Sequence, residues 1–267
     1  MREEVSRTRA RGDLLTRYAW PAPEPTAYLR RLGCRAAFEA KTVVARSPTI
    51  AMPIARRRGH GVPFGPDTEL VVEGFPRSAN SYTVAAIELA QERPMRIAHH
   101  LHAPAHVIAA CRSRRPVLVL VRDPDEAVMC LTISNQWLSL RQGFRAYARF
   151  YRPLVRWRDS FVIGAFPQVT TDLGGVIDEL NARFSLDLRR NDDTNEERQA
   201  CFDAMDGFWR SRVGGGEALE RVVGRPSPWR DGRCAQMAPL LDDPSLAHVR
   251  RQAHELFHEL AVGRVSV

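Results

Sequence analysis

The stretch Leu70–Ile87, LVVEGFPRSANSYTVAAI, decides the fold. It begins as an apolar run typical of a buried strand, breaks at Gly74-Phe75-Pro76, and continues with helical spacing behind a small polar cluster. A strand that leads through a tight loop into a helix often holds a phosphate, because the first N–H groups of the helix point at the ligand. This loop lacks the lysine and glycines of an ATP-binding P-loop and carries Arg77 instead.

The charge of the chain points to an anionic ligand or partner. The 267 residues carry a formal net charge of +8, and nearly all of the positive charge is arginine, since Lys41 is the single lysine. Any cation in a binding site is therefore expected to be a fork-shaped, permanently charged guanidinium. Arginine in place of lysine is typical of a GC-rich genome, which suggests a bacterial source.

The cysteines and the N-terminus favour a cytoplasmic protein. The five cysteines are scattered and form no CxxC pair, which argues against a zinc site or a disulfide framework and for a reducing compartment. The first residues, MREEVSRTRARGDLL, are charged and do not resemble a signal peptide. No apolar run approaches the length of a membrane span.

From residue 70 onward, strand and helix patterns alternate. Strands are expected in LVVEGF, MRIAHHLH, PVLVLVRD and FVIGAF, with helices at about 80–92, 104–114, 124–139, 143–158 and 172–184. Continuous apolar strands alternating with helices predict an α/β fold, with a parallel sheet covered on both faces and a helical C-terminal part. Residues 1–65 are expected to be an irregular basic segment packed on the α/β part, 66–267, within one domain.

Polar clusters follow three of the expected strands, and in such sheets ligands bind at the carboxyl ends of the strands. Arg77 to Ser81 would offer an arginine, hydroxyls and helix N–H groups to an anion, although a capped turn with a solvent-exposed arginine explains the pattern equally well. His99, His100 and His102 could include a general base, a zinc ligand, or simply core histidines. Arg122-Asp123-Pro124 ends the third strand, and by itself suggests an ordinary arginine–aspartate pair.

Taken in order, these segments resemble the PAPS-dependent sulfotransferase family. GFPRSANSY is similar to its 5′-phosphosulfate loop, VLVLVRDPDEAVMC to its 3′-phosphate segment, HHLHAP to the stretch with the catalytic histidine, and FPQVTTDLGGVIDELNARFSLDL to a later strand–helix unit. The resemblance spans about residues 70–188. It implies a three-layer, P-loop-like fold that binds 3′-phosphoadenosine-5′-phosphosulfate (PAPS) as co-substrate and transfers its sulfuryl group to a hydroxyl or amine, without a metal.

The resemblance also implies roles for particular residues. Arg77 would hold the 5′-phosphate and stabilise the leaving group, and His100, or as second choice His102, would be the base. The donor would be held by the loop, the 3′-phosphate segment and a C-terminal loop, through Arg77, Ser78, Ala79, Asn80, Ser81, Tyr82, Arg122, Cys130, Ser134, Arg230 and Arg233. Ala79 replaces the family's loop glycine, and Cys130 replaces a serine that contacts phosphate, with Ser134 as a possible substitute.

Two alternatives remain, and the acceptor is open. A degenerate member could bind a nucleotide or an acidic partner without catalysis, whereas a nucleotide kinase is disfavoured because the G-x-x-x-x-G-K-[ST] motif is absent. The acceptor is expected to be a small molecule, a glycan or a lipid, and no nucleic acid is expected. Its pocket could be lined by aromatic residues, although their helical spacing favours ordinary core packing: Phe144, Tyr147, Phe150, Tyr151, Phe208 and Trp209.

Overall fold

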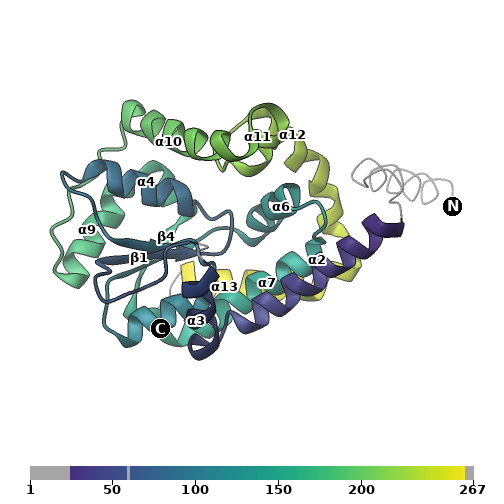
Figure 1. Ribbon diagram of the computed structural model, residues 1–267, viewed down its shortest axis with the longest axis horizontal. Helices are drawn as coiled ribbons and strands as arrows, with labels where there is room; N and C mark the ends of the chain where they lie inside the picture. The colour runs from purple at the N-terminus through teal and green to yellow at the C-terminus, as the bar shows by residue number, and fades with distance from the viewer. Residues whose placement is uncertain (1–24, 59–60, 262–267) are drawn as a thin grey trace.

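The computed structural model describes residues 25–58 and 61–261, and its centre is a four-stranded parallel sheet (Figure 1). The strands are β1 (Leu70–Gly74), β2 (Ile97–His99), β3 (Val117–Val121) and β4 (Val162–Ala165), in the order β2-β1-β3-β4. Each step in this order joins parallel neighbours, with Val72 paired to His99 on one side and Gly74 to Leu120 on the other. The carboxyl ends of β1, β2 and β3 therefore meet at one edge.

Successive residues of each strand point to opposite faces, and both faces are apolar. Val71, Val117 and Val119 pack on one side with residues of helices α5 (Pro104–Arg112), α7 (Leu140–Tyr151) and α13 (Ala247–Ala261). Leu70, Val72 and Leu118 pack on the other side with residues of α4 (Asn80–Ala90), α9 (Leu173–Phe184) and α10 (Asn195–Val213). The predicted α/β fold, a parallel sheet between layers of helices with a helical C-terminal part, is confirmed.

The helices follow the sequence pattern closely. They are α2 (Pro25–Val44), α3 (Pro48–Arg58), α4 (Asn80–Ala90), α5 (Pro104–Arg112), α6 (Pro124–Ser134), α7 (Leu140–Tyr151), α8 (Phe166–Thr171), α9 (Leu173–Phe184), α10 (Asn195–Val213), α11 (Gly216–Val222), α12 (Pro228–Met237) and α13 (Ala247–Ala261), with 3-10 turns η1 (Arg152–Ser160), η2 (Ala238–Asp242) and η3 (Pro244–Leu246).

Two expectations about local structure are wrong. Residues 25–58 are helical rather than irregular, because alanine and arginine are good helix formers and Pro48 stands at the first position of α3, where its missing N–H costs nothing. β2 ends at His99, because His100 has φ 63° and His102 has φ 49°, which a strand cannot accommodate. Residues 1–24 of the expected N-terminal segment lie outside the described residues, and its boundary at residue 65 stays a prediction.

Helix α2 extends the molecule on one side (Figure 1). It packs along α7, and Glu39 of α2 joins the two helices by accepting hydrogen bonds from Arg145, at 2.6 Å, and from Arg149. Over residues 25–58 and 61–261, none of the helices combines the length and the apolar character that a membrane crossing requires.

Candidate functional site

A cavity of about 330 Å³ lies at the edge where β1, β2 and β3 end. Its size falls within the usual range for ligand sites. The loop after β1, the segment after β2 and the end of β3 all contribute to it, and helices α10 to α12 close it from the C-terminal side. Its described lining is Pro76, Arg77, Ala79, Asn80, Ser81, Tyr82, His100, His102, Arg122, Cys130, Phe166, Met205, Trp209, Val222, Gly224, Arg225, Pro226, Arg230 and Asp231.

The loop between β1 and α4 has an uncapped helix N-terminus at its end. Arg77 (φ 73°) and Ala79 (φ 67°) both have left-handed backbone conformations, and no side chain caps α4. The contrast is α6, where the carboxylate of Asp123 accepts hydrogen bonds from the N–H groups of Asp125 and Glu126. The first N–H groups of α4 are therefore available to a bound anion, whereas the first N–H groups of α6 already bind the carboxylate of Asp123.

Two guanidinium groups at the cavity are held by backbone carbonyls. Arg77 donates to the carbonyls of Val222, at 2.8 Å, and Val223, at 3.1 Å. Arg230 is buried and donates to the carbonyls of Glu220, at 2.5 Å, and Val223, at 2.6 Å. Within the described part of the chain, neither arginine forms an ion pair with a carboxylate, and burial together with the charge of Arg77 lowers the pKa of Arg230. This positive charge suits an anionic ligand.

Cys130 lies between these two arginines. Its Sγ accepts hydrogen bonds from Nε of Arg77 and Nη1 of Arg230, both at 3.2 Å. Burial raises the pKa of this thiol, but the charges of Arg77 and Arg230 outweigh burial and lower the pKa to about 7. The resemblance implied that Cys130 replaces a serine at a phosphate; in the structure its sulfur accepts hydrogen bonds from two arginines.

Arg122 reaches the cavity from the end of β3. Its Nη1 donates to the carbonyl of Arg77 at 3.0 Å, which joins the two strand ends, and its guanidinium stacks 3.8 Å from the ring centroid of Phe166. Arg122 also forms an ion pair with Glu126, an exposed glutamate one helical turn further on, at 3.0 Å. Part of the guanidinium thus remains at the cavity surface.

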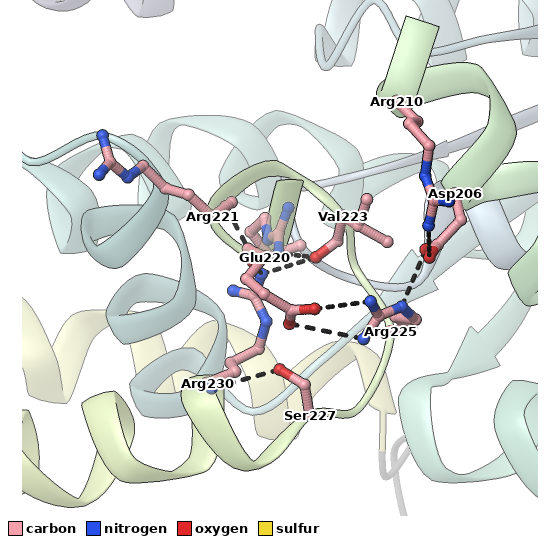
Figure 2. Close-up of polar contacts among 9 residues, drawn as sticks. Asp206, Arg210, Glu220, Arg221, Val223, Arg225, Ser227 and Arg230 are labelled. Carbon is pink, nitrogen blue, oxygen red and sulfur yellow. Dashed lines mark hydrogen bonds and ion pairs between the residues drawn. The ribbon is translucent and has the colours of Figure 1, made fainter. Parts of the chain in front are cut away.

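Residues 220–226, which we call the covering segment, contact Arg230 and are held in place by the ion pairs of Arg225 (Figure 2). Arg225 bonds to Glu220 at 2.6 Å and to Asp206 of α10 at 2.8 Å, so it joins the covering segment to the neighbouring helix. The carbonyls that meet Arg77 and Arg230 belong to this same segment.

The histidine cluster is held by a fully buried carboxylate, Glu73. It accepts hydrogen bonds from the N–H of Leu101, at 2.7 Å, the N–H of His102, at 3.0 Å, and Nδ1 of His106, at 2.9 Å. Since Nε2 of His106 accepts from the N–H of Phe64, this imidazole is neutral. Burial raises the pKa of Glu73, but the bonds from His106 and the backbone outweigh it and keep the pKa below its ordinary value.

His100 and His102 both line the cavity but differ in their bonds. His100 has both ring nitrogens engaged, Nε2 with Oγ of Ser81 at 2.8 Å and Nδ1 with Nδ1 of His99 at 2.5 Å. His102 donates from Nδ1 to the carbonyl of Gly74 at 2.9 Å, so its Nε2 carries a lone pair. Burial is the main cause that lowers the pKa of both histidines, to about 4 for His100.

The structure places most of the expected site residues at the cavity and three of them elsewhere. Ser78 is fully buried beneath the loop, Ser134 donates its hydroxyl to the carbonyls of Cys130 and Arg221, and Arg233 contacts Trp229 and Glu217 on α12 and α11. Of the expected aromatic residues, Trp209 lines this cavity, Phe208 is exposed, and Phe144, Tyr147 and Tyr151 belong to the core. Over residues 25–58 and 61–261 there is no cluster of histidine, cysteine and acidic residues suited to a metal ion.

Sequence reasoning missed Glu73, Arg225 and the covering segment. For Glu73 a signal exists, since a glutamate within the apolar run LVVEG is unusual for a buried strand. For Arg225, nothing in the local sequence distinguishes it from the chain's many surface arginines.

No family model matches the chain, and no curated protein matches it. Among solved structures, the chain is similar to "mouse sulfotransferase SULT7A1 complexed with PAP", with a TM-score of 0.40 and 9% sequence identity over 72% of this chain and 90% of that chain. A likeness at this level does not show what the chain does. The evidence on its function lies in the side chains of the cavity.

Proposed function

We propose that the protein is a sulfotransferase that moves the sulfuryl group of PAPS to a hydroxyl or amine of an acceptor. One observation carries the proposal: the guanidinium groups of Arg77, Arg122 and Arg230 meet the imidazole of His102 around one cavity, at the carboxyl edge of a parallel sheet. Among the described residues, Arg77 and Arg230 have no carboxylate partner, and Arg122 shares its charge only with the exposed Glu126, so this group of cations can bind an anion. A neutral imidazole beside them can accept a proton.

The residues present fit a donor that carries separate phosphate groups. Arg77 and the open N–H groups of α4 would hold a 5′-phosphate, and Arg122 with Arg230 would hold a second phosphate. The carbonyls of Val222 and Val223 now take the hydrogen bonds that a phosphate would take from Arg77. PAPS, when bound, supplies a sulfuryl group on a good leaving group.

The side chains of the cavity then divide the work. His102 takes the proton of the acceptor hydroxyl on Nε2, because its Nδ1–H is held by the carbonyl of Gly74. The acceptor oxygen forms the new bond to sulfur, the bond from sulfur to the phosphate oxygen breaks, and Arg77 stabilises the charge that develops on the leaving phosphate. The hydrogen bonds thus support His102, the second choice from the sequence, over His100, whose two nitrogens are engaged.

Binding of the product nucleotide tests the donor site. Titration calorimetry with 3′,5′-bisphosphoadenosine should show saturable binding to the wild-type chain. Arg77→Ala and Arg122→Ala should each weaken it at least roughly tenfold, because each removes a charge-assisted bond of about 1.5–3 kcal/mol. Arg251→Ala, at an exposed arginine of α13 away from the cavity, is the matched control and should bind normally.

Activity and two further measurements separate the proposal from its alternatives. Transfer of labelled sulfate from PAPS to a panel of phenols, alcohols and amines is the expected result. No binding of the bisphosphate would overturn the proposal. Thermal stabilisation by Mg-ATP instead would favour a nucleotide kinase, and bisphosphate binding without transfer to any acceptor would favour a non-catalytic nucleotide-binding protein.

A further inference from the structure

A second, smaller cavity adjoins the first on the side of helix α2. Its volume is about 40 Å³ and it is partly open, so it admits the reactive end of a molecule rather than the whole of a large one. His102 and Pro76 line both cavities, so one imidazole faces the two of them. The described lining of the smaller cavity is Phe38, Lys41, Thr42, Ala45, Phe75, Pro76, His102, Pro104, Ala146 and Phe150.

The walls of the smaller cavity are apolar and firmly held. Phe75 follows β1, Phe150 lies on α7 and Phe38 lies on α2, and Phe75 and Phe150 pack with ring centroids 6.5 Å apart. Helix α2 is joined to α7 because Glu39 accepts hydrogen bonds from Arg145 and Arg149, and Thr42 accepts one from Arg149 at 3.0 Å. An apolar group can therefore enter between two helices whose spacing is set by these bonds.

Lys41 is the one permanent cation among the described residues that line this cavity. It is exposed, and no ion pair to it occurs within residues 25–58 and 61–261. The nearest acidic residue in the sequence, Glu39, bonds to Arg145 and Arg149 instead, as expected for helix positions two apart, which do not face each other. Lys41 is also close enough to His102 for its charge to act on the imidazole, adding to the effect of burial in lowering its pKa.

We propose that this smaller cavity binds the acceptor, and that the acceptor is a small hydroxyl compound with an apolar body and a carboxylate that pairs with Lys41. The inference rests on the proposed function, since it places the acceptor hydroxyl at His102, between the two cavities. The apolar body contacts Phe38, Phe75 and Phe150, and the carboxylate pairs with the exposed Lys41, which has no ion-pair partner among residues 25–58 and 61–261.

Two phenols that differ only in charge test the assignment. The probes are 4-hydroxyphenylacetate and its neutral amide, 4-hydroxyphenylacetamide, and their binding is measured by saturation-transfer NMR with the 3′,5′-bisphosphate present. We expect the wild-type chain to bind the acid roughly fivefold more tightly than the amide, the upper range for an ion pair at a surface. In Lys41→Gln the ratio should fall to about one, with binding of the amide unchanged.

Two further variants make the test specific. Lys41→Arg keeps the charge and should keep the preference for the acid, whereas Arg46→Gln, at an exposed arginine beyond the end of α2, should leave it unaltered. Equal binding of acid and amide to the wild-type chain, an unchanged preference in Lys41→Gln, or no binding of either phenol would each overturn the assignment.

The outcome can be separated from the fate of the proposed function. Binding of the bisphosphate by calorimetry reports on the donor site alone. If the bisphosphate binds but neither phenol does, the acceptor assignment fails while the donor site stands. If the phenols bind with the expected dependence on Lys41 but the bisphosphate does not bind, the proposed function fails instead.

Discussion

The two sides of the main cavity are built on opposite electrostatic principles. On the histidine side, the carboxylate of Glu73 is fully buried and every bond it makes is to a group that is neutral or belongs to the backbone. On the arginine side, Arg77 and Arg230 are held by carbonyls and a thiol, with no carboxylate among the described residues. The hydrogen bonds of the histidine side are satisfied without a ligand, whereas the arginine side has positive charge that a bound anion can balance.

This difference separates two tasks. The proposed base, His102, has to keep its position, and Glu73 fixes residues 101 and 102, where the backbone of His102 is left-handed. The proposed phosphate site has to gain energy on binding, and Arg77 and Arg230 have no carboxylate partner among the described residues. The following predictions test this contrast, from the largest expected effect to the smallest.

Glu73→Gln should destabilise the folded chain through the histidine side. One oxygen of the glutamine can still accept from Leu101 and His106, but its NH₂ group then faces the N–H of His102. We expect a loss of about 3–5 kcal/mol in the free energy of unfolding, measured by urea denaturation, because a buried charged acceptor is lost and a donor is left unpaired. Glu69→Gln, which removes an exposed ion pair with Arg93, should cost less than about 1 kcal/mol. Equal losses for both variants would contradict this.

The histidine side should make the folded chain less stable at acidic pH. Because burial lowers the pKa of His100 from 6.5 to about 4, between these values the unfolded chain binds a proton that the folded chain does not. Stability should therefore fall as the pH drops from about 6.5 toward 4, by at most about 3 kcal/mol from this residue. His100→Asn, chosen because asparagine tolerates a positive φ, should flatten the dependence of the urea midpoint on pH. The exposed His248→Asn should leave it unchanged.

Phosphate binding at the arginine side should weaken as the pH rises above neutral. As the pH rises through about 7, Cys130 becomes a thiolate between Arg77 and Arg230 and competes with a bound phosphate. We expect the affinity for 3′,5′-bisphosphoadenosine to fall by about fivefold between pH 6 and pH 8.5, equivalent to about 1 kcal/mol. Calorimetry on Cys130→Ser should show no such fall, and the variant Cys201→Ser, at a buried cysteine of α10, serves as the control. A parallel fall in both variants would exclude Cys130 as the cause.

Ala79→Gly should have the smallest effect. Ala79 has φ 67°, a conformation that glycine adopts freely, so the change relieves strain in the folded chain. Glycine also increases the freedom of the unfolded chain, which offsets the gain. We expect the free energy of unfolding, measured by thermal denaturation, to change by less than about 1 kcal/mol, with binding of the bisphosphate retained. A loss of binding would show that the alanine methyl group itself contacts the nucleotide.

The residues of the candidate site that directly follow strand ends could be predicted from the sequence. Arg77, His100, His102 and Arg122 each stand just after an apolar run, and the parallel sheet brings such positions together. The choice between the two histidines was not predictable, because it depends on a hydrogen bond from His102 to the carbonyl of Gly74, on another strand.

The remaining parts depend on contacts between distant segments. Arg230 meets Cys130 from a position 100 residues later in the chain, and no local pattern connects them. Ser134 shows the reverse: it was expected as a possible substitute for Cys130 at a phosphate, but its hydroxyl donates instead to the carbonyl of Cys130 and to that of Arg221.

Because the chain has a single lysine, amine-directed reagents can label the wall of the smaller cavity selectively. Because Lys41 is the single lysine, its side-chain amine and the α-amino group are the two kinds of site that amine-directed reagents can modify. Reductive methylation with ¹³C-formaldehyde would therefore place one side-chain NMR reporter in the whole chain, at the wall of that cavity. An arginine-rich composition thus gives a spectroscopic label whose position needs no mutagenesis to assign.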